Sequence, residues 1–412
     1  MKTIMILGAS VQQIPFIKIC KEFGLKTVVV SRKGKYPGFD LADQVYYYDT
    51  QDKENILKAA CIEEICAITT DQTDVSVATV AYVADKLKLR GIGQEIAKKF
   101  TNKYEMRKAA RDAGIPVPDF CEVKDLYEAL EAVKKIGYPA IIKPVDSSGS
   151  RGVFKINNQY ELRAKFGESM VNSNSKRLVL ESYICGKEYL ADGFAMNYKY
   201  CTLDVGEKEY FDVPNIFVSR MCVFSSVNRK NDRVYEMVEE TNNKLVKSFG
   251  LPFGITHGEY MYVPNEDKVY LVECAARGGG VYLSSDLTPM ATGFDTNRAL
   301  IQYLVYGKET YICKEKLDNK VSAWLCFSFP KGKISKIEGV LETQHIDGVK
   351  KVILDDIYVG MDTEELKNDS GKYGPILVMG NGIVDCQNII SKVRETLKIE
   401  IETDEGIEGV IW

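Results

Sequence analysis

The chain has 412 residues, of which 45% are hydrophobic and 27% are charged. At about 150 residues per domain, this length predicts two to three domains. The plentiful apolar residues exclude disorder as the main state, and the lack of an apolar run of about 18 residues excludes a membrane-spanning protein. A net charge of -4 argues against a nucleic-acid partner bound through phosphate contacts. We therefore expect neither a membrane nor a nucleic-acid partner.

The cysteines and histidines argue against a zinc protein. Eleven cysteines are scattered without a CxxC motif, and His257 and His345 are the two histidines. Such cysteines are typical of a reduced protein in which they pack as small hydrophobic residues. The start of the chain, residues 1–8, is too short for a signal peptide and predicts a buried strand. We expect a cytoplasmic protein.

The first hundred residues alternate between strand and helix patterns. The expected strands are 4–7, 27–30, 45–48 and 67–70, and the expected helices are 14–23, 54–60 and 75–87. This order predicts a Rossmann-like α/β unit with a parallel sheet. The turn after the first strand, residues 8–13, holds only the first glycine of the dinucleotide fingerprint, so NAD binding is not expected.

Beyond residue 100 the pattern becomes mixed. Helices are expected at 102–113, 126–136, 234–249, 294–306 and 383–396. Strands are expected at 139–144, 153–156, 176–183, within 187–224, and at 259–263, 268–275, 321–329, 333–341 and 350–354. This mixture predicts α+β modules after the first domain.

Two glutamates, Glu259 and Glu273, form the strongest candidate site. The period of two places these residues on one face of each strand: His257, Glu259, Met261 and Val263; and Val269, Leu271, Glu273 and Ala275. If Val263 pairs with Val269, Glu259 lies opposite Glu273 on the apolar side of the sheet. Opposed carboxylates are destabilising there, and a divalent cation such as Mg²⁺ would offset their repulsion. In a different register, one glutamate would simply be solvated.

Arg277 follows the second glutamate and precedes Gly278, Gly279 and Gly280. The planar guanidinium suits a carboxylate or a phosphate, and glycines let backbone N–H groups approach an anion closely. The alternative is a surface loop with a solvated arginine.

The loop 146–152 is a second candidate anion site. Its Ser147, Ser148 and Gly149, with Arg151, could cover phosphates, although it is no Walker A motif. Lys143 supports this interpretation, because a lysine ending an apolar strand is poorly placed unless it meets an anion. A plain connection between strands is the alternative.

Three further residues are candidates on weaker evidence. Glu181 and Glu188 flank a turn and could bind an adenine amino group and a ribose, but the residues alone favour an ordinary turn between two strands. His257 shares the strand face of Glu259 and is a candidate for assisting catalysis, although such a histidine is more often a hydrogen-bonded core residue.

Together, these segments resemble the ATP-grasp superfamily of carboxylate–amine ligases, in the branch of the L-amino-acid ligases and biotin carboxylases. The resemblance covers nearly the whole chain. It implies a pre-ATP-grasp domain (1–100), an ATP-grasp domain (101–305) with a smaller lid (116–182), and a C-terminal α+β module (306–412). A homodimer is implied as well.

The resemblance also implies roles for the matched residues. Lys103 and Lys143 would contact the nucleotide phosphates, under the loop 146–152. Glu181 would bind the adenine amino group, and Glu188 would bind the ribose. Ser182 and Ile184 would contact the adenine through their backbone atoms. Glu259 and Glu273 would bind one or two Mg²⁺ ions, with Mn²⁺ as an alternative. Many members have an asparagine two residues after the second glutamate, and this chain has Ala275 there.

The implied activity is ATP-dependent amide or peptide bond formation through an acylphosphate. Arg277, Gly278 and Gly279 would hold the substrate acid, and Arg220 is a further candidate anion contact. Arg277, Lys143 and His257 are the candidate catalytic residues. The alternatives are a bicarbonate-using carboxylase, a purine-pathway ligase, a dinucleotide-dependent oxidoreductase, and a nucleotide-binding regulator without turnover.

Overall fold

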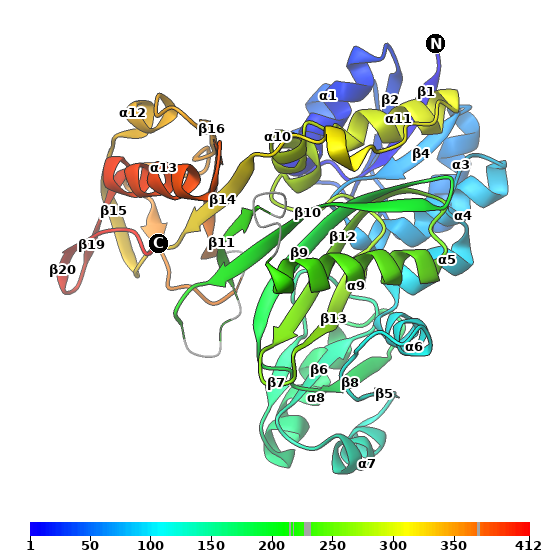
Figure 1. Ribbon diagram of the computed structural model, residues 1–412, viewed down its shortest axis with the longest axis horizontal. Helices are drawn as coiled ribbons and strands as arrows, with labels where there is room; N and C mark the ends of the chain where they lie inside the picture. The colour runs from blue at the N-terminus through cyan, green and yellow to red at the C-terminus, as the bar shows by residue number, and fades with distance from the viewer. Residues whose placement is uncertain (214–215, 217, 226–231, 369–370) are drawn as a thin grey trace.

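The computed structural model describes residues 1–213, 216, 218–225, 232–368 and 371–412 (Figure 1). Its N-terminal sheet has the strand order β3-β2-β1-β4, and all its pairs are parallel. The strands are β1 (Thr3–Leu7), β2 (Lys26–Val30), β3 (Gln44–Tyr46) and β4 (Ala67–Thr70). The helices are α1 (Ile14–Glu22), α2 (Gly38–Leu41), α3 (Lys53–Ile62), α4 (Val77–Leu87) and α5 (Gln94–Thr101). The expected parallel α/β unit is therefore present, and α2 and α5 are helices that the sequence pattern did not indicate.

A second, small sheet lies at the narrow end of the molecule (Figure 1). Its order is β5-β8-β6-β7, and its pairs are antiparallel. It comprises β5 (Phe120–Val123), β6 (Ala140–Pro144), β7 (Phe154–Ile156) and β8 (Leu178–Ser182), with α7 (Leu126–Ile136) and α8 (Gln159–Val171). Residues of these elements form a hydrophobic core of their own. The sequence pattern did not indicate α8.

The largest sheet runs through the centre, in the order β13-β12-β9-β10-β11-β14-β18-β16. Its first five strands are β9 (Lys187–Met196), β10 (Lys199–Tyr210), β11 (Ser219–Phe224), β12 (Phe253–Val263) and β13 (Lys268–Ala275). The helices α6 (Lys103–Asp112) and α9 (Arg233–Phe249) share a buried core with one face of these strands. The other face is therefore left for the cavities described below.

The C-terminal residues continue this sheet instead of forming a wholly separate one. Here β14 (Val321–Phe327), β18 (Tyr373–Gly380) and β16 (Val349–Val352) extend it, while β15 (Gly332–Glu338), β17 (Asp362–Thr363), β19 (Lys398–Thr403) and β20 (Gly406–Glu408) form a fourth sheet. The helices are α12 (Val340–Gln344) and α13 (Ile383–Thr396). The sequence pattern located α13 correctly and did not indicate β18 or β19.

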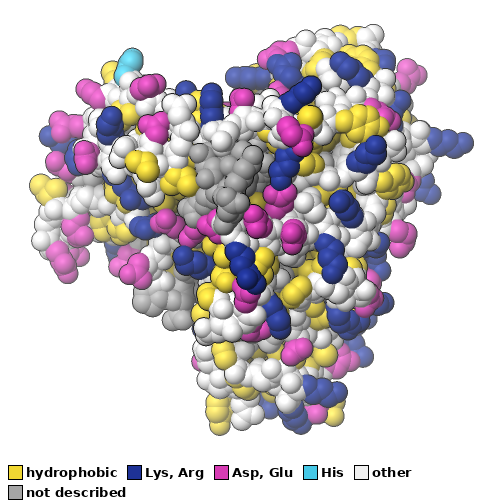
Figure 2. Space-filling view, viewed as in Figure 1, with side chains coloured by type: hydrophobic (Ala, Val, Ile, Leu, Met, Phe, Trp, Pro, Cys, Tyr) yellow, Lys and Arg dark blue, Asp and Glu magenta, His cyan; other side chains and the backbone are white. Residues whose placement is uncertain are grey.

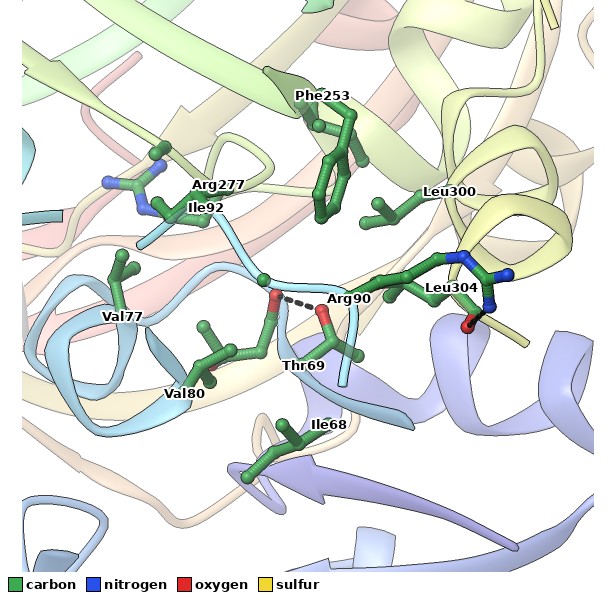
Figure 3. A pocket seen from close by; sticks show the side chains of 15 residues that line it. Ile68, Thr69, Val77, Val80, Arg90, Ile92, Phe253, Arg277, Leu300 and Leu304 are labelled. Carbon is green, nitrogen blue, oxygen red and sulfur yellow. Dashed lines mark hydrogen bonds between the residues drawn. The ribbon is translucent and has the colours of Figure 1, made fainter. Parts of the chain in front are cut away.

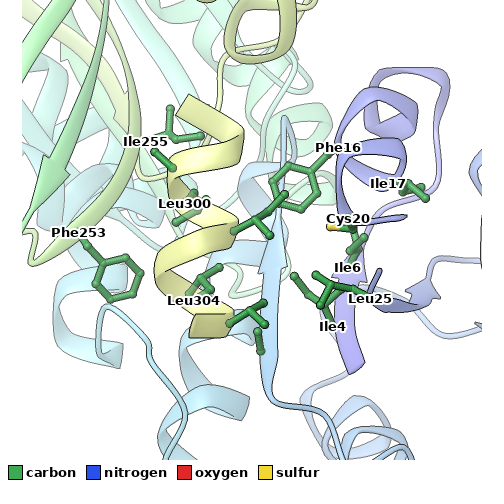
Figure 4. Packing of buried hydrophobic residues seen from close by; sticks show 14 of the residues in the cluster. Ile4, Ile6, Phe16, Ile17, Cys20, Leu25, Phe253, Ile255, Leu300 and Leu304 are labelled. Carbon is green, nitrogen blue, oxygen red and sulfur yellow. The ribbon is translucent and has the colours of Figure 1, made fainter. Parts of the chain in front are cut away.

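Helix α11 (Thr296–Tyr306) fastens the N-terminal sheet to the central one. Figure 4 shows its Leu300 and Leu304 between Phe253 and Ile255 of β12 and the side chains of β1 and α1. The short α10 (Thr288–Thr292) precedes it. Because one hydrophobic cluster spans these elements, the N-terminal sheet is held firmly beside β12.

The surface shown in Figure 2 carries Lys, Arg, Asp and Glu side chains intermixed, and the molecule tapers toward the small sheet. Within the described ranges, every helix is too short or too polar to cross a lipid bilayer. All eleven cysteines are free thiols.

Candidate functional site

Two cavities lie along the open face of the central sheet. The first, of about 410 Å³, is mostly apolar. Its lining includes Lys143, Glu181, Ser182, Ile184 and Glu188, all of them expected nucleotide contacts. The second, of about 470 Å³, is more polar. The two cavities thus separate residues suited to a flat apolar group from residues suited to charged groups.

A buried cluster of three charges lies beside the first cavity. Glu181 Oε2 lies 2.7 Å from Lys143 Nζ, and Glu181 Oε1 lies 2.8 Å from Arg107 Nε. Burial alone would raise the pKa of Glu181, but the charges of Arg107 and Lys143 outweigh it and lower the pKa to about 2. Burial also lowers the pKa of Lys143. Lys143 therefore meets the anion its position demanded, and that anion is Glu181.

Lys208 of β10 connects the two cavities. Its Nζ lies 2.5 Å from Glu188 Oε1 and 3.8 Å from Glu259 Oε2. Glu188 also accepts a hydrogen bond from the Tyr210 hydroxyl. Burial and the nearby Glu259 charge raise the pKa of Glu188 to about 6, although Lys208 opposes that shift. Glu188 lines the first cavity and Glu259 the second, so one lysine balances a carboxylate from each.

Glu259 and Glu273 face each other across β12 and β13. The expected pairing of Val263 with Val269 is wrong, because Val263 pairs with Lys268. A β-bulge then shifts the register, so that Tyr260 pairs with Leu271 while Glu259 pairs with Glu273. The predicted opposition of the two glutamates is nevertheless present.

The bulge also corrects the predicted strand face. Val269 and Leu271 pack in the core, whereas Glu273 and Ala275 line the second cavity. Nor is the glutamate side of the sheet apolar, since the cavity there is polar and the two side chains are 30% and 29% exposed. The extra residue on β13 reverses the alternation of side chains between the two faces.

Lys103 joins the loop 146–152 to this pair of glutamates. Its Nζ lies 2.9 Å from Glu273 Oε1 and donates a hydrogen bond of 2.7 Å to the Ser147 carbonyl oxygen. Ser148 and Gly149 line the second cavity. Arg151 is exposed, and its Nε donates to the Ser148 carbonyl oxygen at 3.0 Å. The loop therefore lies over the glutamates, with Arg151 on its outer side.

His257 lies directly opposite Ala275, between two carboxylates. Its Nδ1 is 2.8 Å from Asp192 Oδ1, and its Nε2 is 3.6 Å from Glu259 Oε1. Burial alone would lower the pKa of His257, but the Asp192 charge outweighs it and raises the pKa to about 9. An imidazolium already holding its proton is a fixed cation at neutral pH.

Arg277 projects into the second cavity from the end of β13. Its Nε donates to Asp74 Oδ1 at 2.7 Å, its Nη2 to Asp74 Oδ2 at 2.8 Å, and its Nη1 to the Gly278 carbonyl oxygen at 2.8 Å. Burial would raise the pKa of Asp74, but the Arg277 charge outweighs it and lowers the pKa.

Most expected site residues come together, but Arg220, Gly278 and Gly279 do not line the two cavities. Arg220 Nη1 donates to the main-chain oxygen of Trp412 at 2.8 Å, and its Nη2 pairs with Glu209 at 3.0 Å. The guanidinium thus has partners elsewhere, and Ser219, not Arg220, lines the cavity. Gly278 and Gly279 are packing positions, because a Cβ there would lie 2.1 Å from Asp71 Oδ1 and 2.9 Å from His257 Nδ1, respectively.

Six residues that line the two cavities were not indicated by the sequence. They are Gln12, Gln72, Asp74, Arg107, Lys208 and Trp324. The first three follow β1 and β4, at the carboxyl edge of the parallel sheet where ligand-binding residues gather. That edge could have indicated them. Lys208 and Arg107 had no such signal, because the partners that explain them are distant in the sequence.

The donor set at Glu259 and Glu273 fits Mg²⁺. Two partly exposed carboxylates face one polar cavity, and oxygen ligands with open positions for phosphate and water are what Mg²⁺ requires. Among the described residues, no cluster of three or more Asp, Glu, His or Cys side chains suits a metal. The remaining ligands would therefore come from substrate and solvent.

Comparisons with known proteins agree with this geometry. Residues 102–303 match the family profile "Carbamoyl-phosphate synthase L chain, ATP binding domain". Alanine–anticapsin ligase of Bacillus subtilis is 27% identical over 308 residues, which cover 68% of this chain and 64% of that protein. The L-arginine-specific L-amino acid ligase of Bacillus subtilis is 25% identical over 249 residues, covering 58% and 59%. The matches thus span about three-fifths of these two relatives.

The fold is shared over almost its entire length with a solved structure. L-amino acid ligase from Bacillus licheniformis superposes with a TM-score of 0.82 at 19% identity, covering 98% of this chain and 99% of that one. In this fold, an apolar cavity lies beside a polar cavity that is lined by the carboxylate pair Glu259 and Glu273. Residues 102–303 thus form the ATP-grasp domain that the family profile describes, and the chain is similar to alanine–anticapsin ligase and to the L-amino acid ligase structure.

Proposed function

We propose that the protein is an ATP-dependent ligase that joins a carboxylic acid to an amine, with an amino acid as one of its substrates. The observation that carries the proposal is the pair Glu259–Glu273, which lies between the apolar cavity and Arg277. ATP would place its adenine in the first cavity and its phosphates beneath the loop 146–152. The names of the two amino-acid ligase relatives support this choice.

The reaction would proceed in two steps. A substrate carboxylate attacks the γ-phosphorus of ATP, and the bond between this phosphorus and the β–γ bridging oxygen breaks. The products of this step are ADP and an acylphosphate. The amine then attacks the acyl carbon, inorganic phosphate leaves, and the amine loses a proton. Bound Mg²⁺ would neutralise charge on the transferring phosphoryl group.

The chain's own residues would position and screen these groups. Lys103 would steady the loop above the phosphates while holding Glu273, and Arg277 would hold the acid and the phosphoryl group that it accepts. His257 would act as a fixed cation beside Glu259, not as the base that takes the amine proton, because its pKa is about 9. Closure of the loop 146–152 would exclude water, which hydrolyses acylphosphates.

Phosphate release from Mg-ATP tests the proposal, with amino acids supplied singly and in pairs and products identified by mass spectrometry. Release that requires an acid and an amine, with an amide product, would establish the ligase. Bicarbonate is one arm of the panel, because carbamoyl-phosphate synthases are also among the relatives. Stimulation by bicarbonate alone would favour a carboxylase instead. The homodimer and the use of Mn²⁺ stay predictions, which light scattering and metal replacement will check.

A further inference from the structure

Asp74 and Arg277 come from different parts of the fold and form a two-point ion pair. Asp74 begins the short 3-10 turn Asp74–Ser76 after β4, and Arg277 follows β13. Both side chains are largely buried, at 19% and 11% exposure. We propose that Asp74 is a positioning residue, which fixes Arg277 so that one edge of its guanidinium faces the substrate. This inference rests on the proposed role of Arg277.

The hydrogen-bond count of the guanidinium shows which edge remains. Arginine has five N–H groups, one on Nε and two on each Nη. Asp74 accepts from Nε and Nη2, and the Gly278 carbonyl oxygen accepts from Nη1. With the hydrogen bonds to all described residues counted, one N–H is left on each Nη. Those two can serve a carboxylate or a phosphate, and Arg277 lines the cavity in which such a group would lie.

The loop that carries Asp74 is itself anchored to the N-terminal sheet. Gln13 Nε2 donates to the Asp71 carbonyl oxygen at 2.6 Å, and Gln72 Nε2 donates to the Gln12 carbonyl oxygen at 2.9 Å. These bonds tie the turn after β1 to the turn after β4. The turn that carries Asp74 is therefore held in place by hydrogen bonds to the turn after β1.

A second contact joins the turn after β4, which carries Asp74, to the segment after β13, which carries Arg277. Ser284 Oγ donates to Asp71 Oδ1 at 3.0 Å, and Gly278 lies so close that a Cβ would be 2.1 Å from both atoms. Figure 3 shows Arg277 near Val77 and Ile92, where these residues share a small cavity of about 50 Å³. The arginine is thus held on its polar side by Asp74 and bordered by the N-terminal unit on its apolar side.

The N-terminal unit, whose first turn lacks a dinucleotide fingerprint, therefore takes part in the substrate site. It would supply no reacting group. Its contribution would be the orientation of Arg277, since an arginine freed from Asp74 could turn toward Glu259 or Glu273, whose negative charges act on it.

The test uses the full chain with the variants Asp74→Asn, Arg277→Lys, the double variant and Glu63→Gln. Glu63 is a matched control, because it pairs with Lys26 at 2.8 Å with 10% exposure at the opposite edge of the same sheet. Steady-state phosphate release gives kcat and KM for the stimulating acid and for ATP. Binding of inorganic phosphate with Mg-ADP, measured by calorimetry, requires no turnover.

We expect Asp74→Asn to lower kcat/KM for the acid by about 30-fold or more while the KM for ATP changes less than about threefold. The double variant should be no worse than Arg277→Lys alone, within about threefold, because both changes remove one function. Phosphate affinity should fall in both single variants and stay unchanged in Glu63→Gln.

Three results decide the matter. Multiplying effects in the double variant, or unchanged phosphate affinity in Asp74→Asn, would overturn the positioning role. If Asp74→Asn and Glu63→Gln both lose activity in proportion to a lowered melting temperature, the Asp74–Arg277 pair is structural. That result would also overturn the positioning role. If no acid or amine stimulates the wild type but Asp74→Asn still loses phosphate, the ligase proposal fails and the positioning role holds.

Discussion

Glu259 and Glu273 lie opposite each other because β13 carries one extra residue, Val272, just before the second glutamate. The Val272 carbonyl oxygen accepts a hydrogen bond of 2.6 Å from Arg107 Nη2. The same arginine pairs with Glu181 beside the first cavity. The carbonyl oxygen at the bulge that aligns the two carboxylates therefore has a hydrogen-bond donor. That donor, Arg107, lines the first cavity.

Replacing Glu273 with Gln should abolish the activity while preserving the fold. The amide keeps the shape and can still bond Lys103, but it removes one of the two charges that would hold Mg²⁺. We expect phosphate release to fall by about 100-fold or more. Calorimetry with Mn²⁺ should show metal affinity lowered by about tenfold.

Glu266→Gln is the control for this change, since Glu266 lies in the exposed turn between β12 and β13 and bonds Tyr270. Its activity and metal affinity should match the wild type. Equal metal affinity in Glu273→Gln and the wild type would contradict the carboxylate pair as the metal site.

Local patterns predicted the elements well where the pattern itself determines them. The helices 126–136 and 383–396 are found at their predicted bounds as α7 and α13. The bulge at Val272 has no such local signal, because a two-residue period cannot reveal an inserted residue. The sequence therefore predicted β13 and the glutamate pair correctly, whereas β12 begins at Phe253 instead of Glu259 and the register at the turn differs from the expected one.

The site residues divide along the same line. Lys143 and Arg277 were predictable from their neighbours in the sequence. A lysine that ends an apolar strand and an arginine that precedes a glycine run are both unexpected in an ordinary core strand or surface loop. Asp74 and Lys208 were not, because each is explained by a carboxylate or cation far away in the sequence. Arg220 shows the reverse error, since an arginine near a cavity can be bound by other partners.

Glu181→Gln should destabilise the fold strongly. It would leave Arg107 and Lys143 as neighbouring buried cations with a neutral partner, whereas Glu181 now pairs with both. We expect the free energy of unfolding to fall by about 3–5 kcal/mol. Urea denaturation measures it, with Glu128→Gln as an exposed control that should cost less than about 0.5 kcal/mol. Similar losses in the two variants would contradict the buried cluster.

His257 should make the stability of the metal-free protein depend on pH in the alkaline range. Its pKa is raised from 6.5 to about 9, so its stabilising contribution is complete below pH 6.5 and is lost as the pH rises through about 9. In His257→Gln, an amide can still bond Asp192 but carries no titrating charge. The wild type should lose on the order of 3 kcal/mol more than this variant between pH 6 and pH 10.

Urea denaturation at several pH values in a chelating buffer checks this expectation. The difference between the two proteins should be constant below pH 6.5 and shrink above it. Parallel curves over the whole range would mean that His257 keeps its ordinary pKa. A gap that widens with pH would mean that burial outweighs Asp192.

Gly278→Ala and Gly280→Ala should differ sharply although the residues are two apart. At Gly278, a methyl group would lie 2.1 Å from Asp71 Oδ1 and Ser284 Oγ, so the contact between the N-terminal loop and the segment after β13 must open. At Gly280, the nearest atom of the described residues is Gln12 Oε1 at 4.0 Å, so none of these residues obstructs the methyl group. We expect Gly278→Ala to cost about 1–3 kcal/mol of stability and Gly280→Ala less than about 0.5 kcal/mol. Because Arg277 precedes Gly278, only the first variant should also raise the KM for the acid substrate. Thermal unfolding and phosphate release measure both effects, and equal behaviour of the two variants would show that the close packing of Asp71 and Ser284 around Gly278 is not what orders this segment.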